Sequence, residues 1–373
     1  MGGHDDDMRL ALELAERGWG RVSPNPMVGA VVVSDEGAIL GKGWHEGPGT
    51  PHAEAMALAH AGERARGATV VSTLEPCNRH GRTPPCTDAL IGAGVSRVVV
   101  AATDPNLGPG APGVAQLRTA GVDVEVGLLQ DQARRLNEAF DHHVTTGRPF
   151  VVLKSAASLD GKTAASDGSS KWITSEEARG DVQRLRAWSD AIVVGSRTVA
   201  EDDPALTVRD PRFIQARPPA RVVVDSAGRL PPVGQLFDGA APTLIATTER
   251  VPEIRVAEWQ TAGAEVIVVD RDGEGGVSLG ALLDVLGKRD VQGVVIEGGA
   301  NLAWAFVRDE LVDRIVLYLA PKVIGGAASL GVVAGKGFAP VDRAAHLVFE
   351  RVERIGPDLK VEARVESGVH RDR

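Results

Sequence analysis

The chain has 373 residues, of which 43% are hydrophobic and 24% charged, so it is long enough for two globular domains that each bury a core. Its formal net charge of −9 argues against a nucleic-acid partner, because such proteins usually carry a basic face, but it leaves room for a small phosphorylated substrate. No apolar run could span a bilayer and the acidic N-terminus lacks the pattern of a secretion signal, so we expect a cytoplasmic protein with no membrane partner.

The first hundred residues are predicted to alternate between helices and strands. Acidic residues, an apolar face and a closing Gly18 predict a helix over 5–17. Strands are expected over 28–34, 68–74 and 95–102, a hairpin partner over 38–43, and helices over 51–62 and 84–92. Three strands joined by two helices predict a βαβαβ unit, whose ligands gather at the carboxyl ends of its strands.

Residues 50–86 contain the parts of a catalytic zinc site. His52 follows Thr50-Pro51, which is typical of an N-cap with proline at the first helical position, and Thr83-Pro84 repeats the pattern before Cys86. Two helix N-termini would therefore converge, and thiolates are favoured at such ends. With Cys77, these residues form a set of three ligands that leaves the fourth position of zinc to water.

Glu54 is predicted to act beside this metal rather than to bind it, since residues two apart do not face the same way on a helix. A carboxylate there could take a proton from an activated water and pass it to a leaving nitrogen, which is hydrolytic deamination. The sequence H-x-E followed by P-C is typical of zinc deaminases, although their second cysteine usually comes sooner. An H-A-E motif alone is commonly a surface feature of a helix, and two cysteines alone are commonly small buried residues. Their combination favours a zinc site.

The later part of the chain repeats the α/β pattern. Residues 103–147 predict a Gly/Pro loop, a helix, a short strand over 122–126 and one last helix. Strands are then expected over 150–154, 191–195, 221–225, 243–246, 265–269, 293–297 and 314–319, with helices such as 175–188 and 301–308 between them. A terminal hairpin over 347–355 and 359–365 would lie on the sheet edge. We therefore expect two domains, 1–147 and 148–373, the second with a largely parallel sheet.

The first half resembles a known enzyme family. The motifs N-P-M-V-G-A-V-V-V (25–33), P-H-A-E-A (51–55) and L-E-P-C with its later T-P-P-C are similar to the deaminase half of the bifunctional pyrimidine deaminase/reductase of riboflavin biosynthesis. The resemblance implies a cytidine-deaminase-like three-layer domain, zinc on His52, Cys77 and Cys86, Glu54 as the catalytic proton donor, and Asn25 and Arg82 at the substrate. The family usually has Ser-His where this chain has Asn78-Arg79.

The second half is similar to the reductase half of the same enzyme. The motifs include K-S-A-A-S-L-D-G-K-T-A (154–164), S-K-W-I-T (170–174), D-D-P-A-L-T-V-R (202–209) and E-G-G-A-N-L (297–302). They imply a dihydrofolate-reductase-like α/β fold that uses NADPH. The implied cofactor residues are Ala156, Trp172, Thr198, Asp202, Ser226, Gly299, Ala300, Asn301, Leu302, Ala303, Trp304 and Ala305. The implied substrate residues are Ser170, Arg186, Leu206, Arg209 and Glu297.

The combined prediction is a bifunctional enzyme that deaminates 2,5-diamino-6-(5-phosphoribosylamino)pyrimidin-4-one and then reduces the ribosyl side chain to ribityl with NADPH. The proton donor of the reduction stays open among Lys154, Asp160, Asp202 and Glu297. The alternatives are a nucleobase or tRNA deaminase with a non-catalytic C-terminal domain, a nucleotide-sensing pair of domains, and an enzyme with only the first activity. We also expect a homo-oligomer.

Overall fold

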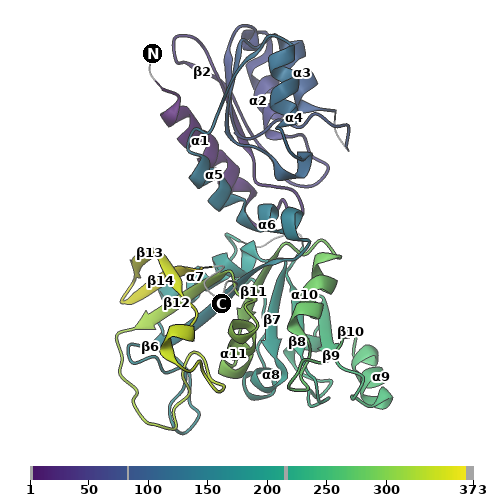
Figure 1. Ribbon diagram of the computed structural model, residues 1–373, viewed down its shortest axis with the longest axis vertical. Coiled ribbons are helices and arrows are strands. Elements are labelled where there is room, and N and C mark those ends of the chain that lie inside the picture. The colour runs from purple at the N-terminus through teal and green to yellow at the C-terminus, as the bar shows by residue number, and fades with distance from the viewer. Residues whose placement is uncertain (1–2, 82–83, 214–216, 367–373) are drawn as a thin grey trace. The chain divides into compact units, whose positions relative to one another are not determined.

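The chain forms two compact units, residues 1–147 and 148–373, each built around its own sheet (Figure 1). The structure is a computed structural model and describes residues 3–81, 84–213 and 217–366. Within these ranges, no helix combines the length and the apolar character needed to cross a membrane.

The N-terminal unit contains a five-stranded sheet in the order β2-β1-β3-β4-β5. Its elements are α1 (Asp5–Ala15), β1 (Gly29–Val33), β2 (Ile39–Trp44), α2 (Ala53–Ala61), β3 (Thr69–Leu74), α3 (Cys86–Ala93), β4 (Arg97–Ala102), α4 (Pro112–Thr119), β5 (Asp123–Val126), α5 (Gln130–Leu136) and α6 (Glu138–Thr146). Strands β3, β4 and β5 are parallel, whereas β1 is antiparallel to both of its neighbours. The predicted βαβαβ unit is therefore wrong at its first strand. The hairpin reverses the chain before α2 begins, so the crossover joins β2, not β1, to β3.

Both faces of this sheet are covered by helices. On β1, Ala30 and Val32 pack with residues of α2, α3 and α4, while Val31 and Val33 pack with residues of α1 and α5. Because successive side chains of a strand point to opposite faces, a strand covered on both faces needs an unbroken apolar run, as Gly29–Val33 provides. This arrangement confirms the predicted three-layer fold.

The predicted last helix of the N-terminal unit is instead two helices. Asn137 separates α5 from α6, with φ −107° and ψ 19°. Its buried side chain bonds to the backbone of Met27, which fixes the asparagine in a position that a continuous helix would not allow.

The C-terminal unit contains a nine-stranded sheet in the order β10-β9-β8-β7-β11-β6-β12-β14-β13. Its strands are β6 (Phe150–Ser158), β7 (Ala191–Gly195), β8 (Ala220–Val224), β9 (Thr243–Thr247), β10 (Glu265–Val268), β11 (Gly293–Glu297), β12 (Arg314–Ala320), β13 (Leu347–Ile355) and β14 (Asp358–Val365). Its α-helices are α7 (Glu176–Trp188), α8 (Ser196–Asp202), α9 (Glu253–Thr261), α10 (Leu279–Gly287) and α11 (Ala300–Arg308). The strands from β10 to β12 are parallel and β14 and β13 are antiparallel, which confirms the predicted parallel sheet and edge hairpin.

The strand order of this sheet predicts where a ligand would bind. Strand β11 lies between β6 and β7, so the connections that follow these central strands leave in different directions. In open parallel sheets, ligands bind at the carboxyl ends of the strands where the order changes in this way. The ends of β6, β7 and β11 are therefore the expected site of the second unit.

Candidate functional site

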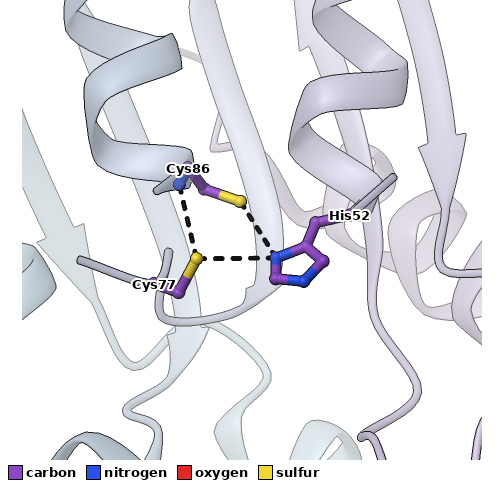
Figure 2. Close-up of side chains that lie close together, drawn as sticks. All are labelled: His52, Cys77 and Cys86. Carbon is purple, nitrogen blue, oxygen red and sulfur yellow. Dashed lines mark hydrogen bonds between the residues drawn. The ribbon is translucent and has the colours of Figure 1, made fainter. Parts of the chain in front are cut away.

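Three potential metal ligands converge in the N-terminal unit. His52, Cys77 and Cys86 each offer one ligand atom, and these atoms all lie within 4.8 Å of one another (Figure 2). The Nδ1 atom of His52 is 3.3 Å from Sγ of Cys86 and 3.5 Å from Sγ of Cys77. The structure thus brings together the three side chains that the sequence singled out.

Two helix N-termini position these ligands, but each begins later than predicted. His52 is the N-cap of α2, which begins at Ala53, and Cys86 is the first residue of α3. The prediction that Pro51 and Pro84 begin the helices is wrong, because extended backbone continues to His52 and Pro85, and Thr83 lies outside the described residues. Each helix therefore directs its N-terminal N–H groups and positive dipole end toward the ligands.

A glycine in β2 allows α2 to lie against the sheet. A Cβ atom on Gly43 would lie 2.1 Å from the carbonyl oxygen of Ala53, which is far closer than real Cβ contacts allow. Any larger residue at this position would push the beginning of α2, and with it His52, away from the cysteines.

The ligand spacing fits zinc. With Zn–S of about 2.3 Å and Zn–N of about 2.0 Å, tetrahedral geometry places ligand atoms roughly 3.5–3.8 Å apart. Hydrogen bonding from the Cys86 side chain, together with His52 and the Cys86 backbone, lowers the pKa of Cys77 to about 4 despite burial. Two free cysteines and an imidazole are thus gathered as a soft ligand set in which a thiolate is already favoured.

Glu54 lies directly beside the ligands. Its side chain is buried, and its Oε2 lies 3.5 Å from Sγ of Cys86. Burial raises the pKa of Glu54, which moves this carboxyl toward the range in which it can both accept and release a proton near neutral pH. The first turn of α2 thus places a carboxyl group next to the three potential ligands.

A pocket of about 460 Å³ opens onto these groups. Asn25 lines it, and its amide Nδ2 lies 2.9 Å from Nε2 of His45, which in turn faces the ring of His52 with centroids 5.5 Å apart. His45 was not predicted as a site residue, because it follows a hairpin strand and has no recognisable spacing to the three potential ligands. Arg82 lies outside the described residues.

Asp104 and Asn106 also line the pocket and were missed. They follow the carboxyl end of β4, so the rule that selected the turn after β3 could have selected them too. Burial raises the pKa of Asp104 to about 6. Arg79, in the Asn78-Arg79 turn, also lines the pocket. Its Nη2 donates to the carbonyl of Leu107 at 2.8 Å.

The cysteine turn is held by a buried carboxylate. Glu75 accepts hydrogen bonds from the backbone N–H groups of Asp104 at 3.1 Å, Gly113 at 2.8 Å and Val114 at 3.2 Å. Two of these donors are in the first turn of α4. Glu75 therefore fixes the chain two residues before Cys77 to the end of β4 and to α4.

The second unit contains a cluster of charged residues at the carboxyl end of β11, beside β6 and α7. Lys154 on β6 and Glu297 on β11 are register partners, and Lys154 Nζ is 3.8 Å from a Glu297 oxygen. From α7, Arg186 donates to both Glu297 oxygens, at 2.6 and 2.9 Å, and to the carbonyl of Thr207 at 3.0 Å. Three side chains that are at most 17% exposed thus form one network.

The glycine pair after β11 begins the predicted cofactor segment. Gly298 and Gly299 have φ of 136° and 51°, and Gly299 is the N-cap of α11. A Cβ on Gly299 would lie 3.1 Å from Oγ1 of Thr198, so α8 and the beginning of α11 face each other. Thr198 and the segment 299–305 are therefore brought together at the carboxyl edge of β7 and β11.

Other predicted reductase residues are spread around this edge. Ala156 lies on β6, and Arg209 donates its backbone N–H to Gln183 at 2.7 Å. Ser226 follows β8 and accepts from Thr248, Asp202 ends α8 at the surface, and Ser170 is half-buried. Trp172 is 64% exposed, with the guanidinium of Arg179 at 4.5 Å over its ring. The side chain of Leu206 is buried in a core cluster with Ile192 and Val223, so only its backbone is available to a ligand.

Comparisons with known proteins match both units. Residues 1–102 match the family model described as the cytidine and deoxycytidylate deaminase zinc-binding region, and residues 149–361 match that of the RibD C-terminal domain.

Whole-chain relatives are also found. The riboflavin biosynthesis protein RibD of Escherichia coli is 42% identical, covering 94% of this chain and 96% of the relative. That of Aquifex aeolicus is 41% identical, covering 95% and 96%. The solved structure of Acinetobacter baumannii RibD matches with a TM-score of 0.87 at 37% identity, covering 97% of this chain and 98% of that one. The chain therefore belongs to the RibD family and is a bifunctional deaminase and reductase of riboflavin biosynthesis.

Proposed function

We propose that the N-terminal unit, 1–147, removes an amino group from 2,5-diamino-6-(5-phosphoribosylamino)pyrimidin-4-one and that the C-terminal unit, 148–373, reduces the product with NADPH. The observation that carries the first step is the convergence of His52, Cys77 and Cys86 beside buried Glu54 in a pocket. A solved relative from Thermotoga maritima, 36% identical with a TM-score of 0.84 and covering 97% of this chain and 99% of that one, is described as a diaminohydroxyphosphoribosylaminopyrimidine deaminase and 5-amino-6-(5-phosphoribosylamino)uracil reductase.

In the deaminase step, we assign zinc binding to His52, Cys77 and Cys86. When bound, zinc supplies a Lewis acid that lowers the pKa of water to about 7. Glu54 takes the proton released from water and delivers it to the amino nitrogen that leaves the ring as ammonia. We assign substrate binding to Asn25, which lines the pocket and contacts His45, and to Arg82.

In the reductase step, the substrate is the ring-opened imine of the ribosylamino group. When bound, NADPH would supply the hydride for this reduction, and a group of the protein would give a proton to the imine nitrogen. We assign the cofactor to Ala156, Trp172, Thr198, Asp202, Ser226 and the segment Gly299–Ala305. We assign the substrate to Ser170, Arg186, Leu206, Arg209 and Glu297.

Among the four candidate proton donors, the contacts favour Lys154. Asp160 accepts from the backbone N–H groups of Ile324 and Gly325 at 3.0 and 2.7 Å, so it holds a loop. Asp202 is exposed, and Glu297 lies between two cations. Burial lowers the pKa of Lys154, which makes its ammonium group a better acid.

The order of the two steps can be tested by mass spectrometry. The diamino substrate is incubated with the purified chain, with and without NADPH. We expect ammonia release without NADPH to give the ring-deaminated ribosyl product, and NADPH to convert this product to the ribityl compound. The nucleobase or tRNA deaminase alternative, which is not favoured, would instead require activity on cytosine, guanine or tRNA and no NADPH oxidation.

We further propose a cytoplasmic homo-oligomer. Free Cys77 and Cys86 suit a reducing compartment. Edge strand β13 exposes Phe349 and Val352, at 71% and 59%, which supports burial against a second copy. A monomer mass in light scattering at micromolar concentration would contradict the oligomer, and recovery of the chain outside the cytoplasm would contradict the compartment.

A further inference from the structure

We propose that Asn137 is a positioning residue of the deaminase site, which holds the loop carrying Asn25 in place. The loop is defined as residues 23–28. This inference rests on the proposed function in one respect, namely that Asn25 binds the substrate of the deaminase step.

Asn137 and the loop are joined by a pair of hydrogen bonds. The backbone N–H of Met27 donates to Oδ1 of Asn137 at 2.7 Å, and Nδ2 of Asn137 donates to the carbonyl oxygen of Met27 at 2.8 Å. Asn137 and Met27 are only 4% and 7% exposed. The amide side chain therefore pairs with the buried backbone of Met27 as a neighbouring strand would, across 110 positions of sequence.

The loop that is held in this way frames the pocket. Asn25, two residues before Met27, contacts His45, and the carbonyl of Val28, one residue after Met27, accepts from the backbone N–H of His45 at 2.9 Å. Nδ1 of His45 lies 3.3 Å from the carbonyl of Pro51, immediately before His52. Asn137 thus fixes Met27, and residues on both sides of Met27 contact His45, which lines the pocket.

Asn137 also begins the helix that contributes a further side chain to the pocket. It is the N-cap of α6, and its carbonyl accepts from Asp141 at 2.9 Å. Phe140, three residues later, lines the same pocket. One residue thus sets both the Asn25 loop and the beginning of the helix that carries Phe140.

The pairing requires an amide. It needs a donor and an acceptor side by side, at a length that reaches the N–H and the C=O of one residue, and only asparagine offers both at this length. Aspartate has nearly the same shape but lacks the donor and would place a carboxylate against the carbonyl of Met27. Asn137→Asp can keep the bond from the Met27 N–H but loses the bond to the Met27 carbonyl and replaces it with repulsion, with little change in volume.

The test is a kinetic comparison of Asn137→Asp with Gln132→Glu, an exposed amide-to-acid change in α5 that makes a matched control. We expect Asn137→Asp to raise the deaminase KM about tenfold or more while the zinc-loaded fraction, and with it most of kcat, is kept. Gln132→Glu should leave both constants unchanged. A fall in kcat that only follows the loss of zinc-loaded protein, with KM unchanged, would mean a purely structural role and overturn the proposal.

A double-mutant cycle with Asn25→Ala tests whether Asn137 acts through the loop. If it does, Asn137→Asp should cost much less in kcat/KM when Asn25 is already alanine; additive losses would overturn the proposal. If Asn137→Asp retains no zinc, the same constants are measured on Asn137→Ser, for which an unchanged KM is the contradicting result. Failure of the proposed function is distinguishable, because then the unmodified chain would not deaminate the substrate at all.

Discussion

Replacement of Glu54 by glutamine is expected to lower the deamination rate by about 10²–10⁴-fold, the usual contribution of a general acid–base group. Glutamine has the same shape but cannot take a proton from water or give one to the leaving nitrogen. Because the change is isosteric and the metal ligands are untouched, the variant should keep its zinc. Ammonia release from the diamino substrate measures the loss.

Two controls accompany this experiment. Glu63→Gln, an exposed change after the end of α2, should release ammonia at the unmodified rate. Reduction of pre-deaminated substrate by Glu54→Gln should also be unchanged, since the Lys154–Glu297 site lies in the other unit. Undiminished ammonia release by Glu54→Gln would remove Glu54 from the mechanism.

Replacement of Arg186 by methionine is expected to destabilise the C-terminal unit by about 3–5 kcal/mol, the usual cost of removing one partner of a buried ion pair. Arg186 satisfies both oxygens of Glu297, whereas Lys154 lies at 3.8 Å and Arg209 adds a further positive charge nearby. Methionine fills a similar volume without the charge, so Glu297 would be left poorly compensated. Hydrogen exchange of β6 and β11, the neighbouring strands that carry Lys154 and Glu297, should detect the loss.

The same network predicts a pH dependence. Burial alone would raise the pKa of Glu297, but the charges of Arg186 and Lys154 outweigh it and lower the pKa to about 2. A folded-state pKa below the unfolded value means that the carboxylate stabilises the fold above about pH 4.5, and that this contribution is lost as the pH falls toward 2. Arg186→Met should lose much of this dependence, whereas Arg289→Met, which breaks an exposed pair with Glu265, should change little. Equal pH profiles for the unmodified chain and Arg186→Met would contradict the assignment.

Local sequence patterns predicted most elements, because the central strands of both sheets are apolar runs between turns. The patterns failed where contacts between residues distant in sequence determine the structure. The direction of β1 depends on the hairpin that follows it, and the break between α5 and α6 depends on the bonds from Asn137 to Met27. Proline marked the approach to α2 and α3 but not their first residues, since both helices begin after further extended backbone.

The candidate metal centre could be anticipated because its ligands occur in recognisable motifs with distinctive chemistry. His45 could not, since only the folded hairpin brings the end of β2 to the ring of His52. The ion pair between Arg186 and Glu297 could not be anticipated either, since it joins residues 111 positions apart. Motifs therefore reveal the residues that react, while the residues that hold them in place are visible only in three dimensions.

His52, Cys77 and Cys86 are expected to hold the zinc on which the first activity, and not the second, depends. The direct measurement is elemental analysis combined with both activities before and after treatment with a chelator. We predict about one zinc per chain, loss of ammonia release when it is removed, unchanged NADPH oxidation on pre-deaminated substrate, and recovery with added zinc. Ammonia release that persists in metal-free protein would contradict the dependence of the first activity on zinc.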